Sequence, residues 1–182
     1  MVSVAMIAYN KADVIGDAIK GVVSQWAPFE IELIIVDDAS TDTTYAVASE
    51  WARRYPDIIK LYRNAANKGL QANYVEAFSH CRGKYLAVCD ADDYWIYRRK
   101  LAVQVGYMER HPECALTFHR VVNYYEKDGT MSLSNGGQRR DCDIIALSRS
   151  NFITNLSVVY RKDLVDLTRL PSWILDDRSP DY

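Results

Sequence analysis

Short apolar runs alternate with stretches of helical periodicity through the first 110 residues, and this alternation restricts the fold more than any other feature. The apolar runs occupy residues 2–9, 31–38, 58–64 and 84–90. Apolar residues recur at helical spacing in four further stretches, residues 15–26, 44–55, 70–81 and 101–108. A repeated strand–helix order predicts an α/β fold with a mostly parallel central sheet and helices on both faces. The nearly unbroken apolar strands favour the same fold, because strands covered on both faces need no polar side.

The pattern changes after Pro112. Residues 114–133 are typical of a strand and a turn, and residues 156–161 of another strand. We interpret this part as an extension of the same domain, with mixed strand directions, so that residues 1–182 form one domain. The final residues place Ser179 as an N-cap and Pro180 at the first helical position. This pattern starts a helix that residue 182 cuts off, so we expect the domain to be truncated at its C-terminus.

Composition and missing motifs exclude several classes of protein. The net charge is −2 and no basic stripe is present, so a nucleic-acid partner is not expected. No apolar run is long enough for a membrane span, and we expect a cytoplasmic chain. The four cysteines have no short paired spacing, which favours reduced, buried thiols over a zinc site or disulfides. Neither glycine-rich phosphate loop, G-x-G-x-x-G or G-x-x-x-x-G-K-[ST], occurs, which argues against dinucleotide dehydrogenases and P-loop nucleotidases.

Each of the four predicted parallel strands has polar or acidic residues at or just beyond its carboxyl end. In strand order, the residues at these ends are Ala8, Tyr9, Asn10 and Asp13; Asp37 and Asp38; Asn64, Asn67 and Gly69; and Asp90, Asp92 and Asp93. Ligands of open parallel sheets bind outside the carboxyl ends of the strands. The sequence therefore predicts a polar, acidic site at this edge of the sheet.

The acidic triplet is the most informative part of that edge. Residues two apart on an extended chain point to the same side, so Asp90 and Asp92 are expected to share a target. Carboxylate oxygens suit Mg²⁺ or Mn²⁺, which take substrate phosphates as further ligands. A turn or helix-cap cluster is the alternative, and it explains one aspartate better than three. If phosphates bind, a cation would hold them and stabilise the charge on a departing nucleoside diphosphate.

Three segments together resemble family-two glycosyltransferases of the GT-A fold: "VSVAMIAYNKADVIGDAIKGVVSQ", "IELIIVDDASTDTT" and "NKGLQANYVEAFSHCRGKYLAVCDADDYW". The resemblance covers residues 2 to about 110. It implies an inverting, metal-dependent enzyme that moves a sugar from a nucleotide diphosphate donor, with a UDP-sugar as the expected donor. Residues 1–110 would then be the donor half and residues 111–182 the acceptor half.

The resemblance also implies roles for single residues. The nucleobase would be held by Ala8, Tyr9, Asn10 and Asp38, with Tyr9 stacked on it. Asp13 and the loop with Asn67 and Gly69 would lie along the nucleotide. Asp90 would contact the ribose, and either Asp92 or Asp93 would bind the metal. The resemblance does not decide between these two aspartates.

Each of these roles has a structural alternative. Tyr9 could be a packed aromatic residue at the end of a strand, and Asp38 could only cap the second helix. Asn67 and Gly69 could simply form a turn. Asn73 is expected to face the ligand side of its helix rather than the core.

Inverting transfer also requires a base that accepts the proton of the acceptor hydroxyl. The downstream candidates are Asp141, Asp143, Asp176, Asp177 and Asp181. Some relatives in the family carry a Trp…Asp-Tyr arrangement with the base at the start of a helix, and "WILDDRSPDY" resembles it. This makes Asp181 the first candidate and Asp177 the second. A helix N-terminus would favour the ionised form that a base requires.

The sequence thus predicts a metal-assisted glycosyltransferase with Mn²⁺ or Mg²⁺ and a saccharide or lipid-linked saccharide acceptor. By family habit it could work peripherally at the inner face of the membrane. One alternative is a non-catalytic module that binds nucleotide-sugars. A sugar-phosphate nucleotidyltransferase fits less well, because residues 8–13 lack the glycine-rich, basic phosphate loop with which those enzymes usually begin.

Overall fold

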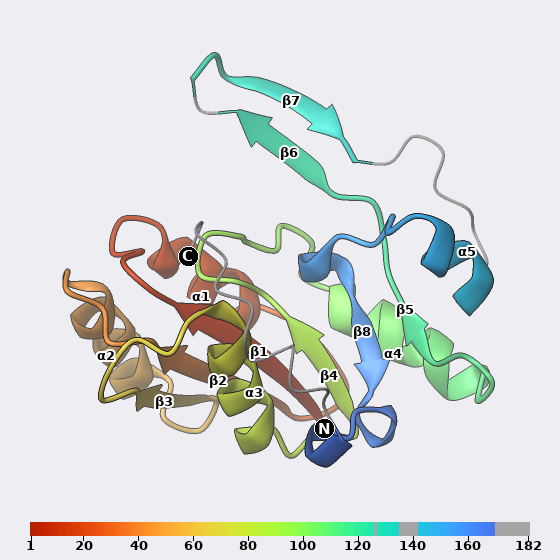
Figure 1. Cartoon of the computed structure of the whole chain (residues 1–182), viewed down its shortest axis with the longest axis horizontal. Coiled ribbons are helices and arrows are strands. Elements are labelled where there is room, and N and C mark those ends of the chain that lie inside the picture. Colours follow the sequence, from red (N-terminus) through yellow and green to blue (C-terminus); the bar gives the residue numbers. More distant parts are fainter. Residues whose placement is uncertain (126, 135–141, 170–182) are drawn as a thin grey trace.

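A computed structural model describes residues 1–125, 127–134 and 142–169 (Figure 1). Its core is a six-stranded sheet with the order β3-β2-β1-β4-β8-β5. The strands are β1 (Val2–Ala8), β2 (Ile31–Asp37), β3 (Ile59–Arg63), β4 (Tyr85–Val88), β5 (Leu116–Thr117) and β8 (Val159–Arg161). The first four are mutually parallel, whereas β8 runs antiparallel to both of its neighbours. The predicted α/β fold with a mostly parallel sheet is confirmed.

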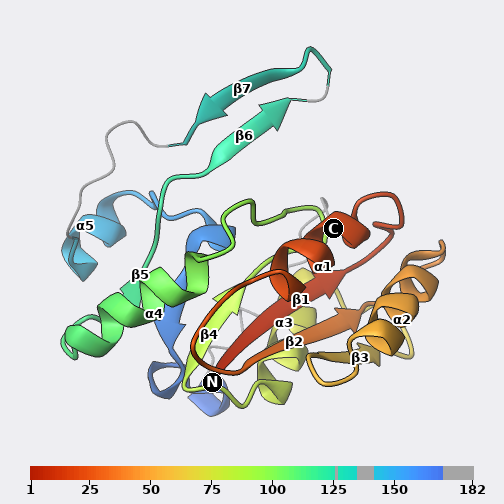
Figure 2. The same cartoon turned by 180° about the vertical axis from the view of Figure 1, so that it is seen from behind.

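Helices cover both faces of this sheet. On one face lie α1 (Ile15–Val23), α2 (Thr44–Arg54) and α4 (Lys100–Arg110); on the other lies α3 (Leu70–His80). Figure 1 is seen from the α3 side and Figure 2 from the α1 and α4 side. Successive strand residues point to opposite faces. In β1, Val4 and Met6 therefore join the core under α1 and α4, and Ala5 and Ile7 join the core under α3.

The second half of the described chain extends the sheet and adds a hairpin. β6 (Val122–Tyr125) pairs antiparallel with β7 (Thr130–Leu133), and this hairpin projects from the body in both views (Figures 1 and 2). The expected mixture of strand directions is confirmed. The strand predicted at residues 156–161 is shorter, because a 3₁₀ turn at Asn155–Ser157 precedes β8.

One helix was missed by the sequence patterns. α5 (Ile144–Arg149) has six residues, too few to show a helical period. Its N-cap is Asp143, whose Oδ1 accepts a hydrogen bond from the Ala146 amide at 2.8 Å. Asp143 therefore has a capping role, which weakens it as a candidate base.

None of the four cysteines, all of which lie in the described ranges, forms a disulfide. Cys81 and Cys89 are buried, but Cys114 is half-buried and Cys142 is exposed, so the expectation of four buried thiols was wrong for these two. None of the helices in the described part of the chain is both long and apolar enough to cross a membrane.

Candidate functional site

A pocket of about 180 Å³ opens at the carboxyl ends of β1 and β4, beside the start of α3. Its lining residues are Ile7, Tyr9, Lys11, Leu70, Asp90, Ala91 and Asp92. Three residues expected at the site, Tyr9, Asp90 and Asp92, therefore lie around one cavity. This arrangement follows from the parallel pairing of β1 with β4, which brings both strand ends to the same edge.

The loop after β1 is fastened to the loop after β2. Asn10 has a positive φ of 52°, and its Oδ1 accepts a hydrogen bond from the Thr41 amide at 2.9 Å. The Ala12 amide donates to Asp42 Oδ2 at 3.2 Å. The Asn10 side chain thus holds the backbone of the site in place, and Asp13 is exposed in the turn that follows.

Asp38 is fully buried and organises the loop that leads into α3. Its carboxylate accepts hydrogen bonds from the amides of Lys68 and Gly69 and from Asn64 Nδ2, at 2.6 to 3.1 Å. The Asp38 amide in turn donates to the carbonyl of Ala8 at 2.8 Å. Asp38 therefore ties the ends of β1 and β2 to the start of α3. The cap-only alternative was wrong, since Asp42 accepts the Thr44 amide at the start of α2.

The loop before α3 forms a local turn. Asn67 Oδ1 accepts a hydrogen bond from the Gly69 amide at 3.0 Å, and Gly69 has a positive φ of 85° that few other residues adopt. Asn73 is fully buried, where it accepts from Asn64 Nδ2 and donates to the carbonyl of Val36. The expectation that Asn73 faces a ligand was therefore wrong, because its amide is consumed inside the fold.

The acidic triplet is folded into a turn rather than extended. The Asp93 amide donates to the carbonyl of Asp90 at 3.0 Å, since β4 already ends at Val88. Asp90 and Asp92 consequently have different protein partners, although both line the same pocket. The expected shared target therefore stays a prediction. Asp92 Oδ2 forms an ion pair with Lys11 Nζ at 2.8 Å.

Asp90 is held by two side chains from distant parts of the chain. Its Oδ1 accepts from the Tyr74 hydroxyl at 2.5 Å and its Oδ2 from Asn155 Nδ2 at 3.3 Å. Asn155 Nδ2 also donates to the Tyr74 hydroxyl at 2.7 Å. Tyr74 belongs to the apolar pattern of residues 70–81, which predicts packing in the core and no contact with Asp90. Nothing local to Asn155 signals its contact either. Lys11 was missed as well, although a lysine in the loop after the first strand is a signal that could have found it.

Negative charge in the triplet exceeds what these contacts neutralise. Burial, followed by the charges of Asp90 and Asp92, raises the pKa of Asp93 to about 6. Burial also raises the pKa of Asp90, against the opposing hydrogen bonds from Tyr74 and Asn155. A carboxyl group whose pKa rises in this way is stabilised by a cation placed beside it.

The acidic triplet offers carboxylate oxygens, which are the ligands that divalent metals such as Mg²⁺ prefer. Within the described ranges, no three His, Cys, Asp or Glu side chains are grouped as metal ligands. Mg²⁺ and Mn²⁺ are often held by only one or two carboxylates, with phosphates and water as the other ligands. Asp92 already binds the ammonium group of Lys11, and the negative charges of Asp90 and Asp92 act on Asp93. The carboxylates of Asp92 and Asp93 are thus of the chemical kind that such a cation takes as ligands.

We expect Asp93→Asn to stabilise the metal-free protein at pH 8 by about 1 to 2 kcal/mol, a value reduced for the partial exposure of the side chain. The raised folded-state pKa means that ionising Asp93 costs stability. This cost is absent at a pH below 3.8, the pKa of Asp93 in the unfolded chain. It grows as the pH rises toward the folded-state pKa of about 6 and persists at higher pH. Urea unfolding in chelator at pH 8 and pH 4 measures it. An equal effect at both pH values would contradict the electrostatic cause.

Of the five candidate bases, only Asp143 lies within the described residues. Asp177 and Asp181 lie outside the described residues, as do Asp141 and Asp176. The role of base therefore stays a prediction.

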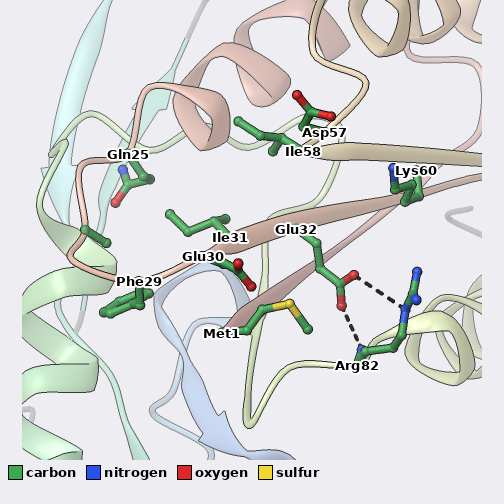
Figure 3. Close-up of a pocket in the computed structure, with 11 residues that line it drawn as sticks. Met1, Gln25, Phe29, Glu30, Ile31, Glu32, Asp57, Ile58, Lys60 and Arg82 are labelled. Carbon is green, nitrogen blue, oxygen red and sulfur yellow. Dashed lines mark hydrogen bonds and ion pairs between the residues drawn. The ribbon is translucent and has the colours of Figure 1, made fainter.

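A larger pocket, of about 570 Å³, lies at the opposite edge of the sheet (Figure 3). Its apolar lining includes Phe29, Ile31 and Ile58. Glu32 and Arg82 also line it, and the Arg82 amide donates to Glu32 Oε1 at 2.7 Å. None of the residues expected at the site lines this pocket, and it faces the amino ends of β1 and β2. The smaller pocket beside the acidic triplet is therefore the candidate site.

Comparison with known proteins identifies the family of this chain. The sequence profile of Glycosyl transferase family 2 matches residues 3–167. An uncharacterised protein of Mycobacterium tuberculosis (Rv1520) is 42% identical over 162 residues, which cover 88% of this chain and 46% of that protein. The Escherichia coli UDP-Glc:alpha-D-GlcNAc-diphosphoundecaprenol beta-1,3-glucosyltransferase WfaP is 30% identical over 88% of this chain and 65% of its own length. The chain spans about half the length of the mycobacterial relative it matches.

Solved structures share the fold at low identity. A fragment of Staphylococcus aureus TarS (residues 1–349), in complex with UDP-GlcNAc, has a TM-score of 0.70 and 21% identity, over 90% of this chain and 46% of the fragment. The mannosyltransferase PcManGT from Pyrobaculum calidifontis, in complex with GDP-Man and Mn²⁺, has a TM-score of 0.66 and 21% identity, over 90% of this chain and 45% of PcManGT. At this identity the two structures establish the GT-A fold alone. Because the family profile matches residues 3–167, which are most of the chain, the chain belongs to glycosyl transferase family 2.

Proposed function

We propose that residues 1–182 form one catalytic domain of an inverting glycosyltransferase that uses a UDP-sugar donor. Residues 1–110 would bind the donor and residues 111–182 would contribute the acceptor side. The observation that carries this proposal is the acidic triplet beside the pocket at the carboxyl edge of the sheet. Membership of the family supports glycosyl transfer as the reaction.

The nucleotide would lie along the loops that Asn10 and Asp38 hold in place. Tyr9 lines the pocket and would stack on the base, with Ala8 and Asp13 on the same loop. Asn67 and Gly69 would border the nucleotide from the start of α3. Asp90, already oriented by Tyr74 and Asn155, would accept a hydrogen bond from the ribose.

Asp92 and Asp93 would hold a Mn²⁺ or Mg²⁺ ion together with the diphosphate. When bound, the ion would supply a positive charge that stabilises the departing nucleoside diphosphate. Lys11, which forms an ion pair with Asp92 in this structure, would contact a phosphate oxygen once the metal binds the aspartate. A protein with Mn²⁺ among the structural neighbours supports this part of the proposal.

The acceptor half would supply the base, with Asp181 as first candidate and Asp177 as second. The base takes the proton of the acceptor hydroxyl while the oxygen of that hydroxyl forms a bond to the anomeric carbon of the donor sugar. The bond to the donor oxygen breaks on the opposite face, so that the configuration inverts and the UDP leaves with the bonding electrons. The printed name of WfaP, a transferase to a diphosphoundecaprenol-linked sugar, supports a saccharide or lipid-linked saccharide acceptor. A cytoplasmic enzyme at the inner face of the membrane would fit such an acceptor.

Calorimetric titration of UDP into the 182-residue chain tests the donor assignment. We expect UDP to bind with Mn²⁺ present and to bind at least about tenfold more weakly after chelation. GDP and ADP serve as nucleotide controls. Tight binding of UDP-sugars without transfer to any acceptor would favour a binding module over an enzyme. Equal binding of UDP with and without metal would contradict the role given to Asp92 and Asp93.

A further inference from the structure

An exposed surface rich in aromatic, aliphatic and arginine side chains lies outside the candidate site. Ile96 is 77% exposed, Trp26 58% and Tyr97 56%, although such residues are usually at least half-buried. The whole surface, termed the α4 face here, consists of Trp26, Ile96, Tyr97, Arg98, Arg99, Val103, Tyr107 and Arg110. Nothing in the proposed reaction uses these side chains.

Backbone contacts make the first part of the α4 face one continuous surface. The Trp26 amide donates to the carbonyl of Arg98 at 2.7 Å. The Arg99 guanidinium lies over the Trp26 ring, 5.1 Å from its centre. Gln25 Nε2 donates to the carbonyl of Tyr97 at 2.9 Å. The residues that follow α1 are therefore fixed against the segment that joins the acidic triplet to α4.

Helical spacing continues this surface along α4. Arg99, Val103 and Tyr107 follow at intervals of four residues, and Arg110 lies on the same side, three residues after Tyr107. All four are exposed, whereas Leu101, Val105 and Met108 on the opposite side of α4 pack in the core. α4 is on the near side in Figure 2, and no other element of the described chain lies over it. The helix therefore presents apolar groups to solvent as well as to the core.

The α4 face carries positive charge. Arg98, Arg99 and Arg110 are exposed. The exposed acidic residue of α4, Glu109, is paired with Lys84 at 2.7 Å and so is neutralised. Tryptophan and tyrosine prefer the boundary between lipid headgroups and acyl chains, and arginine binds lipid phosphates. These are the components of a surface that lies on an anionic bilayer.

We propose that the α4 face docks the protein on an anionic lipid bilayer. Ile96 and Trp26 would enter the headgroup boundary, and the three arginines would bind lipid phosphates. Ile96 is three residues after Asp93 in the chain, so docking would place the rim of the candidate site close to the membrane. The proposal deepens the location at the inner face of the membrane proposed above, on which it rests, by naming the surface that would contact the bilayer. Vesicle binding and UDP binding are measured separately, so that either can fail without the other.

Vesicle co-sedimentation of the 182-residue chain tests the docking. We expect binding to phosphatidylcholine vesicles that contain phosphatidylglycerol, weaker binding at high salt, and none to pure phosphatidylcholine. Arg98→Gln with Arg99→Gln should weaken binding about 25-fold, or about fivefold for each arginine. The variant with lysine at both positions should retain most of the binding. Ile96→Ser should weaken binding through loss of apolar contact.

A matched control is available on the hairpin. Met131 and Leu133 are equally exposed apolar residues, 71% and 64%, with no arginine among the β6 and β7 residues. Met131→Ser with Leu133→Ser should leave vesicle binding unchanged, and all variants should bind UDP like the parent chain. Three results would overturn the proposal: no binding to anionic vesicles, an equal loss in the hairpin control, or a dimer in light scattering that the arginine variant dissociates. The last result would identify the α4 face as a contact between two copies.

Discussion

Replacing both Asp92 and Asp93 by asparagine is expected to weaken metal-dependent UDP binding by about 100-fold or more, which is about 3 kcal/mol. The two carboxylates are the groups that fit the cation, and asparagine cannot supply their charge. The change also removes two of three closely spaced negative charges, so the metal-free variant should be at least as stable as the parent chain. Titration calorimetry with Mn²⁺ and UDP measures the binding, and thermal unfolding measures the stability.

A second double variant separates this effect from a general loss of charge. Glu30 and Asp57 are exposed carboxylates at the larger pocket on the opposite edge of the sheet (Figure 3). Glu30→Gln with Asp57→Asn changes the net charge by the same amount and should leave UDP affinity within about twofold. If the Asp92 and Asp93 variant kept its affinity, the cation would have to be held elsewhere. If both variants lost affinity equally, long-range charge would be the cause.

Replacing Gly21 by alanine is expected to destabilise the fold by about 2 to 4 kcal/mol. A Cβ atom at Gly21 would lie 2.8 Å from the Trp95 amide nitrogen and 3.0 Å from its carbonyl oxygen. Both are backbone atoms, so no side-chain rotation can relieve the clash. Trp95 is also fixed, because it is buried and its Nε1 donates to the carbonyl of Leu156 at 3.0 Å. The segment that follows the acidic triplet would have to move, and UDP binding should weaken with it.

Gly16 provides the control within the same helix. Its added Cβ would meet Trp51 Nε1 at 3.6 Å, an ordinary contact. Gly16→Ala should therefore stabilise the protein by about 0.5 to 1 kcal/mol through helix propensity. Urea unfolding of both variants compares the two positions. A Gly21→Ala protein as stable as the Gly16→Ala protein would show that α1 can shift away from Trp95 at no cost.

The alternation of strands and helices could be predicted from the sequence, because the apolar pattern of each element lies within its own residues. All seven residues of β1 and six of the seven in β2 are buried, so their apolar runs are nearly unbroken. The sheet edge was predictable for the same reason, since parallel strands bring their carboxyl ends together. The acidic triplet, Tyr9 and the loop after β1 therefore lie where the sequence indicates, and family membership follows from those motifs.

Partner choice at the site was decided by tertiary structure. Asp38 could have faced a ligand or capped α2, and the position of the loop before α3 turned its carboxylate toward the amides of Lys68 and Gly69. Asn155 reaches Asp90 across 65 residues because the short β8 pairs antiparallel with β4 and carries the preceding turn to the site. A three-residue strand is too short to show a period, and a hydrogen bond between distant residues leaves no local pattern. Sequence thus determined the fold and the edge of the sheet that carries the candidate site. Long-range packing determined the protein partners of the side chains at that edge.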